Sequence, residues 1–489
     1  MRRIGLRRGA YVDSVTLMQV SRRVASLDGV TSALVAMATE LNVDLATGMG
    51  FEVPDVSPNE MLVAIAADSD EALARAEAEV EAALTEASRP SAPGGFGSAP
   101  PPVTVRAAAA RSGATAALIS TPGQHAFVDA VDAVDAGLLT MVFSDNVPLE
   151  QEVALKEYAD ENDVLVMGPD CGTAVLGGVG LGFANVVRPG PVGIVAASGT
   201  GAQHLMSLLD GAGVGVSHCL GVGGRDLSEQ VAGRSTMRAL DLLAHDEQTE
   251  VVVVVSKPPA PAVAERVRAR AAGLGKPVVL ALLGPGQPDL TETARTVAEA
   301  TGSSWAAPEG WPGSVRHGRG GALRGLFAGG TLCEEAMIVA ADRLGPVYSN
   351  IPLDPRWALD EDLALGDHHA MLDLGDDRFT RGRPHPMIDG STRVDLARRL
   401  LEDPATSVLM LDVVLGHAAE SDPAGELGAT VRIATGLEIP VVVSVVGTRD
   451  DPQKLDQQIR VLRDAGAWVH RSNAEAARAA VALATGGTP

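Results

Sequence analysis

Short apolar runs alternate with amphipathic segments along most of the chain. The runs at 192–197, 251–255 and 441–446 consist almost entirely of small apolar residues, which predicts strands buried on both faces. Strands that alternate with helices indicate parallel sheets covered by helices. In open parallel sheets, ligands bind beyond the carboxyl ends of the strands. The loops that follow the strands are therefore the places where we expect a site.

The stretch 190–217 contains the clearest strand, turn and helix start. After the apolar run come Ser198, Gly199, Thr200 and Gly201, and then leucines and a methionine at helical spacing. Free backbone N–H groups and the helix dipole at such a terminus favour an anion. The two hydroxyls add donors, and the glycines let a ligand approach the backbone. A plain helix cap is the alternative interpretation of the same residues.

The pattern divides the chain into four folded parts. We expect a small α+β domain at 1–87, with strands at 9–13, 30–37 and 60–66, because the order of its elements suits a ferredoxin-like arrangement. Residues 88–104 are rich in proline, glycine and serine and predict a linker. The remaining predicted parts are an α/β domain at 105–190, a second at 191–300, a linker at 301–328 and a last α/β domain at 329–489.

Three loops of the first α/β domain follow predicted strands and are its candidate binding loops. They lie at 120–125, 144–148 and 168–173. None of them follows a first strand with the G-x-G-x-x-G spacing that cradles a dinucleotide pyrophosphate. The sequence therefore does not support a standard dinucleotide site.

Composition and charge exclude several classes of partner. Hydrophobic residues make up 46% of the chain and charged residues 21%, as in globular proteins, while aromatic residues make up only 3%. The formal net charge of −23 argues against nucleic acid or an anionic membrane as a main partner. Any phosphate site must therefore be local, built from backbone N–H groups and a few cations.

The cysteines and the N-terminus point to the cytoplasm. The three cysteines, Cys171, Cys219 and Cys333, are far apart and lack metal-ligand spacing, so we expect a reducing compartment and no metal site. The basic N-terminus has no apolar segment typical of a secretory signal, and the longest purely apolar run is far too short for a membrane span.

Set in order, the turn motifs resemble a known superfamily. ISTPGQHAFVDAVDA, VMGPDCGTAVLGG, GPVGIVAASGTGAQH and GVGGRDLSEQVAG are similar to the α subunit of succinyl-CoA synthetase. AMLDLGDDRFTRGRPHPMIDGSTR, VLMLDVVLGHAAE and IPVVVSVVGTRD are similar to the C-terminal domain of its β subunit. One chain with both parts behind YVDSVTLMQVSRRVASLDGV most closely resembles the FdrA family.

The resemblance implies a fold and a site. The fold is α/β: a CoA-binding Rossmann-like domain and two flavodoxin-like succinyl-CoA synthetase domains, preceded by the ferredoxin-like α+β domain. In the superfamily two helix N-termini point at one phosphate. The residues that would form this phosphate or substrate site are Ser198, Gly199, Thr200 and Gly201 on one side, Gly416, His417 and Ala418 on the other, with Gly223 and Gly224. The residues that would form a CoA-like site are Thr121, Pro122, Gly123, Asp170 and Cys171.

The chain departs from the ligase where that enzyme carries its phosphate. The loop after the run at 277–283 lacks the phosphorylated histidine, and the acid that would hold the histidine falls near Ser256 and Lys257, where there is no glutamate. The ATP-binding half of the β subunit has no counterpart, so no ATP site is evident.

Two residues remain candidates for catalysis. We interpret His417 as a substitution at a phosphate turn rather than as the missing phosphohistidine. Asp226, after two glycines, suits either the cap of the next helix or a contact with a substrate N–H.

The leading hypothesis is an FdrA-like subunit that transfers an acyl or carbamoyl group with phosphate or an acyl or carbamoyl phosphate. The resemblance implies carbamoyl transfer from oxalurate to phosphate, giving oxamate and carbamoyl phosphate, in an oligomer with partner subunits encoded alongside. The first alternative is an ADP-forming acyl-CoA ligase that binds CoA. The second is a scaffold or metabolite-sensing subunit without catalysis.

Overall fold

The N-terminal unit is a small antiparallel sheet with helices packed on it. The computed structural model describes residues 1–7, 12, 14–54, 56–57, 60–87, 102–360, 363, 365–380 and 383–489. The elements of this unit are β1 (Arg2–Arg7), α1 (Ser14–Ala25), β2 (Val30–Met37), α2 (Glu40–Gly48), β3 (Met61–Ala67) and α3 (Asp70–Ala87). The strands pair in the order β1-β3-β2 and are all antiparallel. Apart from Val12, the strand predicted at 9–13 lies outside the described residues, as does most of the predicted linker.

The next unit is a three-stranded parallel sheet with order β4-β5-β6. Its elements are α4 (Val105–Ser112), β4 (Ala116–Ile119), α5 (Gly123–Asp135), β5 (Leu139–Val142), α6 (Leu149–Glu161) and β6 (Val166–Met167). Each of the three strands is followed by one of the three candidate binding loops predicted from the sequence.

The second α/β sheet has six strands in the order β12-β11-β9-β10-β7-β8. Its elements are β7 (Thr173–Leu176), β8 (Val179–Gly182), β9 (Val192–Ala197), α7 (Gly199–Gly211), β10 (Val216–Gly221), α8 (Arg234–His245), β11 (Val251–Ser256), α9 (Pro261–Ala272), β12 (Val278–Leu282) and α10 (Leu290–Ala300). The hairpin β7-β8 pairs antiparallel with β10. Residues 173–182 therefore belong to this sheet, although the predicted domain boundary stands at 190.

The third sheet has seven strands in the order β13-β19-β18-β17-β14-β16-β15. Its elements are β13 (Gly310–Trp311), β14 (Ala322–Phe327), α11 (Gly330–Leu344), β15 (Val347–Tyr348), η1 (Pro355–Trp357), β16 (His369–Asp373), α12 (Asp377–Thr380), α13 (Ser391–Glu402), β17 (Thr406–Val414), α14 (Pro423–Gly436), β18 (Val441–Val446), α15 (Leu455–Asp464), β19 (Trp468–His470) and α16 (Asn473–Ala484). All pairs are parallel except that of β13 with β19.

The predicted linker at 301–328 is wrong in its last part. Residues 322–327 form β14, a fully buried strand between β16 and β17. Arg324 and Gly325 interrupt its apolar pattern. The buried guanidinium of Arg324 donates to the carbonyls of His368 and Gly366 and pairs with Asp403 at 3.0 Å, so both of its Nη groups have partners inside the fold.

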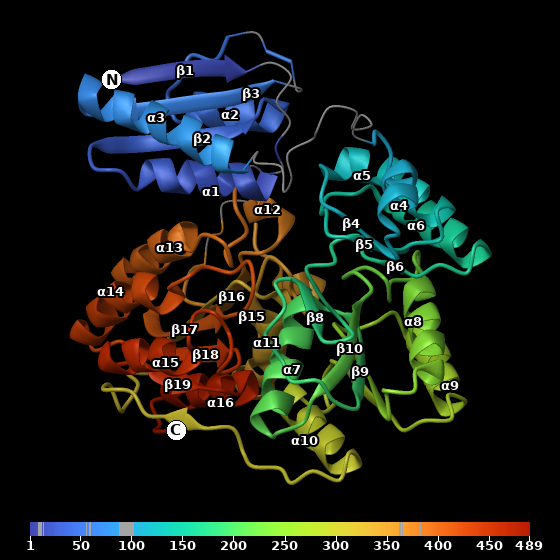
Figure 1. Cartoon of the computed structure of the whole chain (residues 1–489). Helices are drawn as coiled ribbons and strands as arrows, with labels where there is room; N and C mark the ends of the chain where they lie inside the picture. The colour runs from blue at the N-terminus through green and yellow to red at the C-terminus, as the bar shows by residue number, and fades with distance from the viewer. Residues whose placement is uncertain are drawn as a thin grey trace.

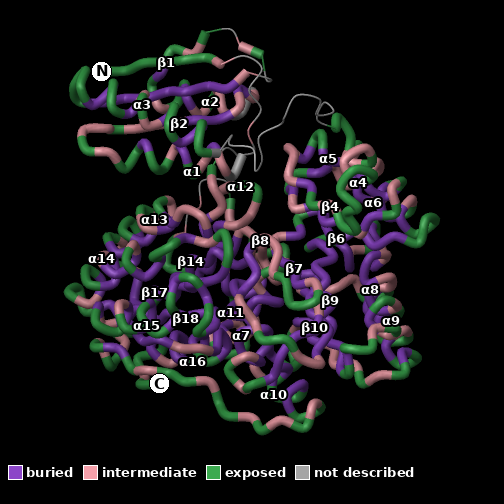
Figure 2. The backbone as a smooth tube through the Cα atoms, viewed as in Figure 1, coloured by how far each residue is buried: buried purple, intermediate pink, exposed green. Residues whose placement is uncertain are grey.

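The expected α/β fold with parallel sheets is confirmed. Figure 1 shows the N-terminal unit, in blue, seated above the C-terminal unit, with α1 turned toward it. Figure 2 shows the central strands of the two large sheets as buried, and α7 and α11 lie side by side between these sheets. Among the described residues, no helix is long and apolar enough to cross a membrane.

Candidate functional site

The turn between β9 and α7 begins the helix as the sequence predicts. Ser198 is the N-cap, and its Oγ accepts the N–H of Gly201 at 2.9 Å. Within the part of the chain that the structure describes, no acceptor takes the N–H groups of Gly199 or Thr200. Two backbone donors at the positive end of the helix dipole thus remain available.

A second helix N-terminus meets this turn, and it belongs to α11. The hydroxyls of Ser198 and Thr331 lie 2.6 Å apart, so one donates to the other. Thr200 packs on Gly329, where a Cβ would lie 2.8 Å from the Thr200 Oγ1. The turn Gly329-Gly330-Thr331 is therefore the partner of the α7 turn, and both helix dipoles have their positive ends at this contact.

The expected partner turn at 416–418 has another role, and its pairing with the α7 turn is wrong. The N–H of Gly416 donates to Gln453 Oε1 at 3.1 Å, and that of His417 donates to the carbonyl of Ala184 at 2.9 Å. A Cβ on Gly416 would lie within 2.9 Å of the carbonyls of Phe183 and Ala184. This turn, with Ala418 at φ 59° and no helix start until Pro423, packs one domain on the other and leaves His417 exposed.

A lysine and a carboxyl group flank the first residue of α11. A Cβ on Gly330 would lie 3.1 Å from the Nζ of Lys257 and 2.5 Å from the Oδ2 of Asp373. Lys257 follows β11 and Asp373 ends β16, so two sheets deliver these side chains to one place. Lys257 has no hydrogen-bond or ion-pair partner among the described residues. An unpaired ammonium beside two helix N-termini suits an anion.

The protonation of these groups follows from burial and charge. Burial lowers the pKa of Lys257, but the carboxyl groups of Glu334, Asp373 and Asp170 outweigh burial and raise it, so the ammonium stays charged. Burial raises the pKa of Asp373 to about 7, although Lys257 and the N–H of Gly375 oppose the change. Burial also raises the pKa of Glu334. The site thus holds one cation and a carboxyl group that changes charge near neutrality.

Asp412 fixes the start of α11 from behind. Its two carboxylate oxygens accept the N–H groups of Ala328 at 2.8 Å and Gly329 at 2.9 Å. Arg393 donates to the same carboxylate at 2.8 Å and to the carbonyl of Asp412 at 2.7 Å. Both side chains are buried. No described acceptor takes the N–H groups of Gly330 and Thr331, so these remain for a ligand.

The residues predicted for a CoA-like site lie after β4 and after β6 of the first α/β unit. Thr121 and Pro122 precede α5, and the carbonyl of Thr121 accepts the hydroxyl of Ser144. A Cβ on Gly123 would lie 2.1 Å from the carbonyl of Asp145, so the helix start packs directly on the neighbouring loop. Asp170 is exposed at φ 57°. Cys171 is buried against Gly221, and burial raises the pKa of its thiol, which leaves it unreactive.

Gly223 and Gly224 face the turn that contains Asp170. A Cβ on Gly223, which has φ +90°, would lie 2.4 Å from the carbonyl of Pro169. A Cβ on Gly224 would lie 3.7 Å from the Oδ2 of Asp170. Because the backbone at 223 approaches the carbonyl of Pro169 so closely, this position requires a glycine. The two glycines thus lie where the first unit contacts the second sheet.

Asp226 caps a helix in the structure. It accepts the N–H groups of Ser235 at 3.3 Å and Thr236 at 3.0 Å in the first turn of α8, and it pairs with Lys156 at 2.8 Å. Lys156 also donates to Glu152 and to the carbonyl of Val222, both at 2.9 Å. Of the two interpretations of Asp226, the helix cap is confirmed, and complete burial of the side chain leaves no room for the substrate contact.

Sequence reasoning missed half of the site. Ser198 and Thr200 are where the motif indicates, but Gly329, Gly330 and Thr331 are not among the predicted site residues. The signal was present, because a glycine pair and a threonine directly follow an apolar segment. Lys257 stands where the resemblance requires a glutamate, and this reversal of charge was the second signal.

Comparison with known proteins shows which family this chain belongs to. An uncharacterized protein, YahF of Escherichia coli K12, is 37% identical over 497 residues, covering 95% of each chain. The chain belongs to the FdrA-like family. Residues 326–483 match the CoA-ligase family, and residues 1–100 match the heavy metal-associated domain of AllF. All three cysteines of this FdrA-like chain lie beyond residue 100.

More distant relatives cover part of the FdrA-like chain. The α subunit of malate–CoA ligase from Methylorubrum extorquens is 28% identical over 36% of this chain and 61% of its own length. The α subunit of ADP-forming succinate–CoA ligase from Aquifex aeolicus is 28% identical over 32% and 51%. The chain thus spans about half the length of these subunits. A dinucleotide-forming acetyl-coenzyme A synthetase from Ca. Korarchaeum cryptofilum matches 75% of this chain and 82% of its own at 18% identity, with a TM-score of 0.26.

Proposed function

We propose that this chain is the phosphate-binding subunit of a group-transfer enzyme, in which an acyl or carbamoyl group passes to or from phosphate between the N-termini of α7 and α11. The observation that supports this proposal is the contact of Ser198 with Thr331 at 2.6 Å, which aims two helix N-termini at one place beside Lys257. Backbone N–H groups and an ammonium are the donors that a phosphate prefers.

The missing phosphohistidine decides how the phosphate would act. Without a histidine to carry it, phosphate itself attacks the carbonyl of the donor. With oxalurate as donor, an oxygen of phosphate forms a bond to the carbamoyl carbon. The bond from that carbon to the nitrogen that links it to the oxalyl group breaks, and oxamate leaves. The proton lost by phosphate goes to the departing nitrogen. Asp373, which changes charge near neutrality and lies at the N-terminus of α11, is placed to pass this proton.

The decisive experiment assays formation of carbamoyl phosphate from oxalurate and inorganic phosphate. The subunits of the CoA ligases it resembles suggest that partner proteins complete the enzyme, so the assay uses the chain alone and in complex with proteins encoded alongside it. We expect phosphate-dependent turnover in the complex. Absence of carbamoyl phosphate from a stable, stoichiometric complex would refute the carbamoyl reaction.

An ADP-forming acyl-CoA ligase is the second candidate, because residues 326–483 match the CoA-ligase family. In that reaction the thiol of CoA takes the acyl group, and CoA would lie along Thr121, Pro122, Gly123 and Asp170. Isothermal titration with CoA separates the candidates, since saturable binding favours the ligase and its absence disfavours it. A scaffold or sensing role remains if the partner proteins are fully active without this chain.

The affinity for an anion depends on pH through Asp373. Because burial raises the pKa of this carboxyl group to about 7, it is neutral at pH 6 and negative at pH 8, where it repels an anion at Gly330. Sulfate is the better probe because its charge is constant over this range. We expect its affinity to fall about tenfold from pH 6 to pH 8, and Asp373→Asn to reduce this slope. Asp170, whose pKa is also raised to about 7 and which acts on Lys257, accounts for the remainder. An unchanged slope in the variant would contradict the assignment.

A further inference from the structure

The N-terminal unit contacts the C-terminal unit through Arg22 of α1. Its Nη1 pairs with Glu420 and donates to the carbonyl of Ile388 at 3.1 Å, and its Nη2 donates to Glu426 Oε1 at 3.0 Å. These partners are separated from Arg22 by more than 360 residues of sequence. One side chain thus joins the ferredoxin-like unit to two carboxylates of another domain.

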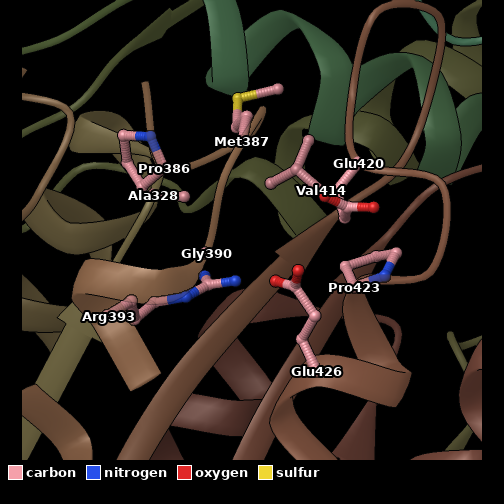
Figure 3. A pocket seen from close by; sticks show the side chains of 9 residues that line it. All are labelled: Ala328, Pro386, Met387, Gly390, Arg393, Val414, Glu420, Pro423 and Glu426. Carbon is pink, nitrogen blue, oxygen red and sulfur yellow. The ribbon is translucent and has the colours of Figure 1, made fainter. Parts of the chain in front are cut away.

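The two carboxylates line a small pocket of the C-terminal unit. The space inside it is about 10 Å³, room for about one water molecule. The residues that line it are Ala328, Pro386, Met387, Gly390, Arg393, Val414, Glu420, Pro423 and Glu426. Figure 3 shows the guanidinium of Arg393 and the carboxylate of Glu426 pointing toward each other across the pocket. Glycine at 390 leaves room for this approach, since a Cβ there would lie 2.6 Å from Glu426 Oε2.

Arg393 has its other contacts on the side of the anion site. Its Nη1 holds Asp412 at 2.8 Å, and Asp412 in turn holds the N–H groups of Ala328 and Gly329 at the start of α11. Ala328 also lines the pocket. The same guanidinium therefore stands between the carboxylates that Arg22 pairs with and the carboxylate that positions α11.

We propose that Arg22 is a positioning residue for the anion site, because it neutralises Glu420 and Glu426 and so leaves Arg393 on Asp412. Glu420 is nearly buried, and its Oε1 accepts the N–H and hydroxyl of Ser421 and the N–H of Asp422, so Arg22 is the cation on its Oε2. Without Arg22, Arg393 is the cation that lines the pocket beside both glutamates, and it turns toward them. The N–H groups of Ala328 and Gly329 then lose a firmly held acceptor, and the start of α11 loosens. Docking of the N-terminal unit is thereby coupled to phosphate binding.

The neighbouring arginine supplies a matched control. Arg23 also lies on α1, but it pairs with Glu79 and Glu86 inside its own unit. Arg23→Ala removes the same charge from the same helix without touching the pocket. Arg22→Lys keeps the charge but reaches one carboxylate at a time, so it should restore part of the effect.

The experiment compares full-length wild type, Arg22→Ala, Arg22→Lys and Arg23→Ala by two measurements. Amide hydrogen exchange of the peptide that covers 326–333 reports the start of α11, and isothermal titration reports the affinity for inorganic phosphate. In Arg22→Ala we expect faster exchange in this peptide and an affinity at least about fivefold weaker. Arg22→Lys should lie between, and Arg23→Ala should match the wild type.

The two measurements separate this proposal from the function on which its second half rests. Unchanged exchange at 326–333 in Arg22→Ala, or an equal change in Arg23→Ala, overturns the positioning role. Faster exchange with unchanged phosphate affinity overturns the coupling and leaves the phosphate site intact. If the wild type binds no phosphate, the proposed function fails, while hydrogen exchange still decides whether Arg22 positions α11.

Discussion

Replacing Lys156 by methionine should lower the free energy of unfolding by about 3–5 kcal/mol. The ammonium is almost completely buried and is shared by Glu152, Asp226 and the carbonyl of Val222. Methionine fills a similar volume but leaves the buried carboxylate of Asp226 without a cation and that of Glu152 with Arg225 alone, and such charges lie in a medium that solvates them poorly. Denaturant unfolding of the variant and the wild type measures the difference.

An exposed ion pair between α8 and the residues that follow α6 provides the control. Arg238 on α8 pairs with Asp163 at 2.9 Å, but the Asp163 side chain is 87% exposed. Arg238→Met should therefore lower the free energy of unfolding by less than about 1 kcal/mol. The triple variant Glu152→Gln, Lys156→Met, Asp226→Asn should recover part of the loss. Equal losses at Lys156 and Arg238 would contradict the buried network.

Replacing Lys257 by methionine should weaken phosphate binding by about tenfold to a hundredfold, the worth of one hydrogen bond between charged groups. Lys257 is the cation that lies beside Gly330, and it has no partner among the described residues that would keep it from a ligand. The fold should hold, because the variant removes no hydrogen bond or ion pair that Lys257 makes with the described residues. Isothermal titration with phosphate measures the change.

Lys276 is the matched control for this change. It lies just before β12, and its ammonium donates to the carbonyls of Leu243 and Asp246, away from the helix N-termini. Lys276→Met alters the net charge of the protein by the same amount and should leave phosphate affinity unchanged. Equal weakening in both variants would show that net charge, rather than the site, governs binding.

The buried strands could be predicted because both of their faces are apolar. The runs at 192–197 and 441–446 are strands with the predicted bounds. The pattern failed at β14, where Arg324 and Gly325 break an apolar run that is nonetheless fully buried. The side chain of Arg324 finds its acceptors in segments 42 to 79 residues further along the chain. The hydrophobicity of neighbouring residues carries no information about partners that far away in the sequence.

The candidate site was only half predictable for a related reason. The Ser198 turn has a local signature, since a hydroxyl cap and glycines follow a strand. Its partner is decided by how two sheets pack, and the sequence offers two glycine turns, at 329 and at 416. Gly416 and His417 have their N–H groups taken by Gln453 and Ala184, whereas those of Gly330 and Thr331 have no acceptor among the described residues. Only three-dimensional contacts separate these choices.

The position of β14 sets the order in which the site comes into being during synthesis. This strand leads into the N-terminus of α11, but it lies between β16 and β17, which are both translated later. Asp412, which holds the first amides of α11, also arrives with β17. A nascent chain on the ribosome therefore has the α7 half of the anion site long before the α11 half. The proposed phosphate site is therefore complete only after most of the chain has been made.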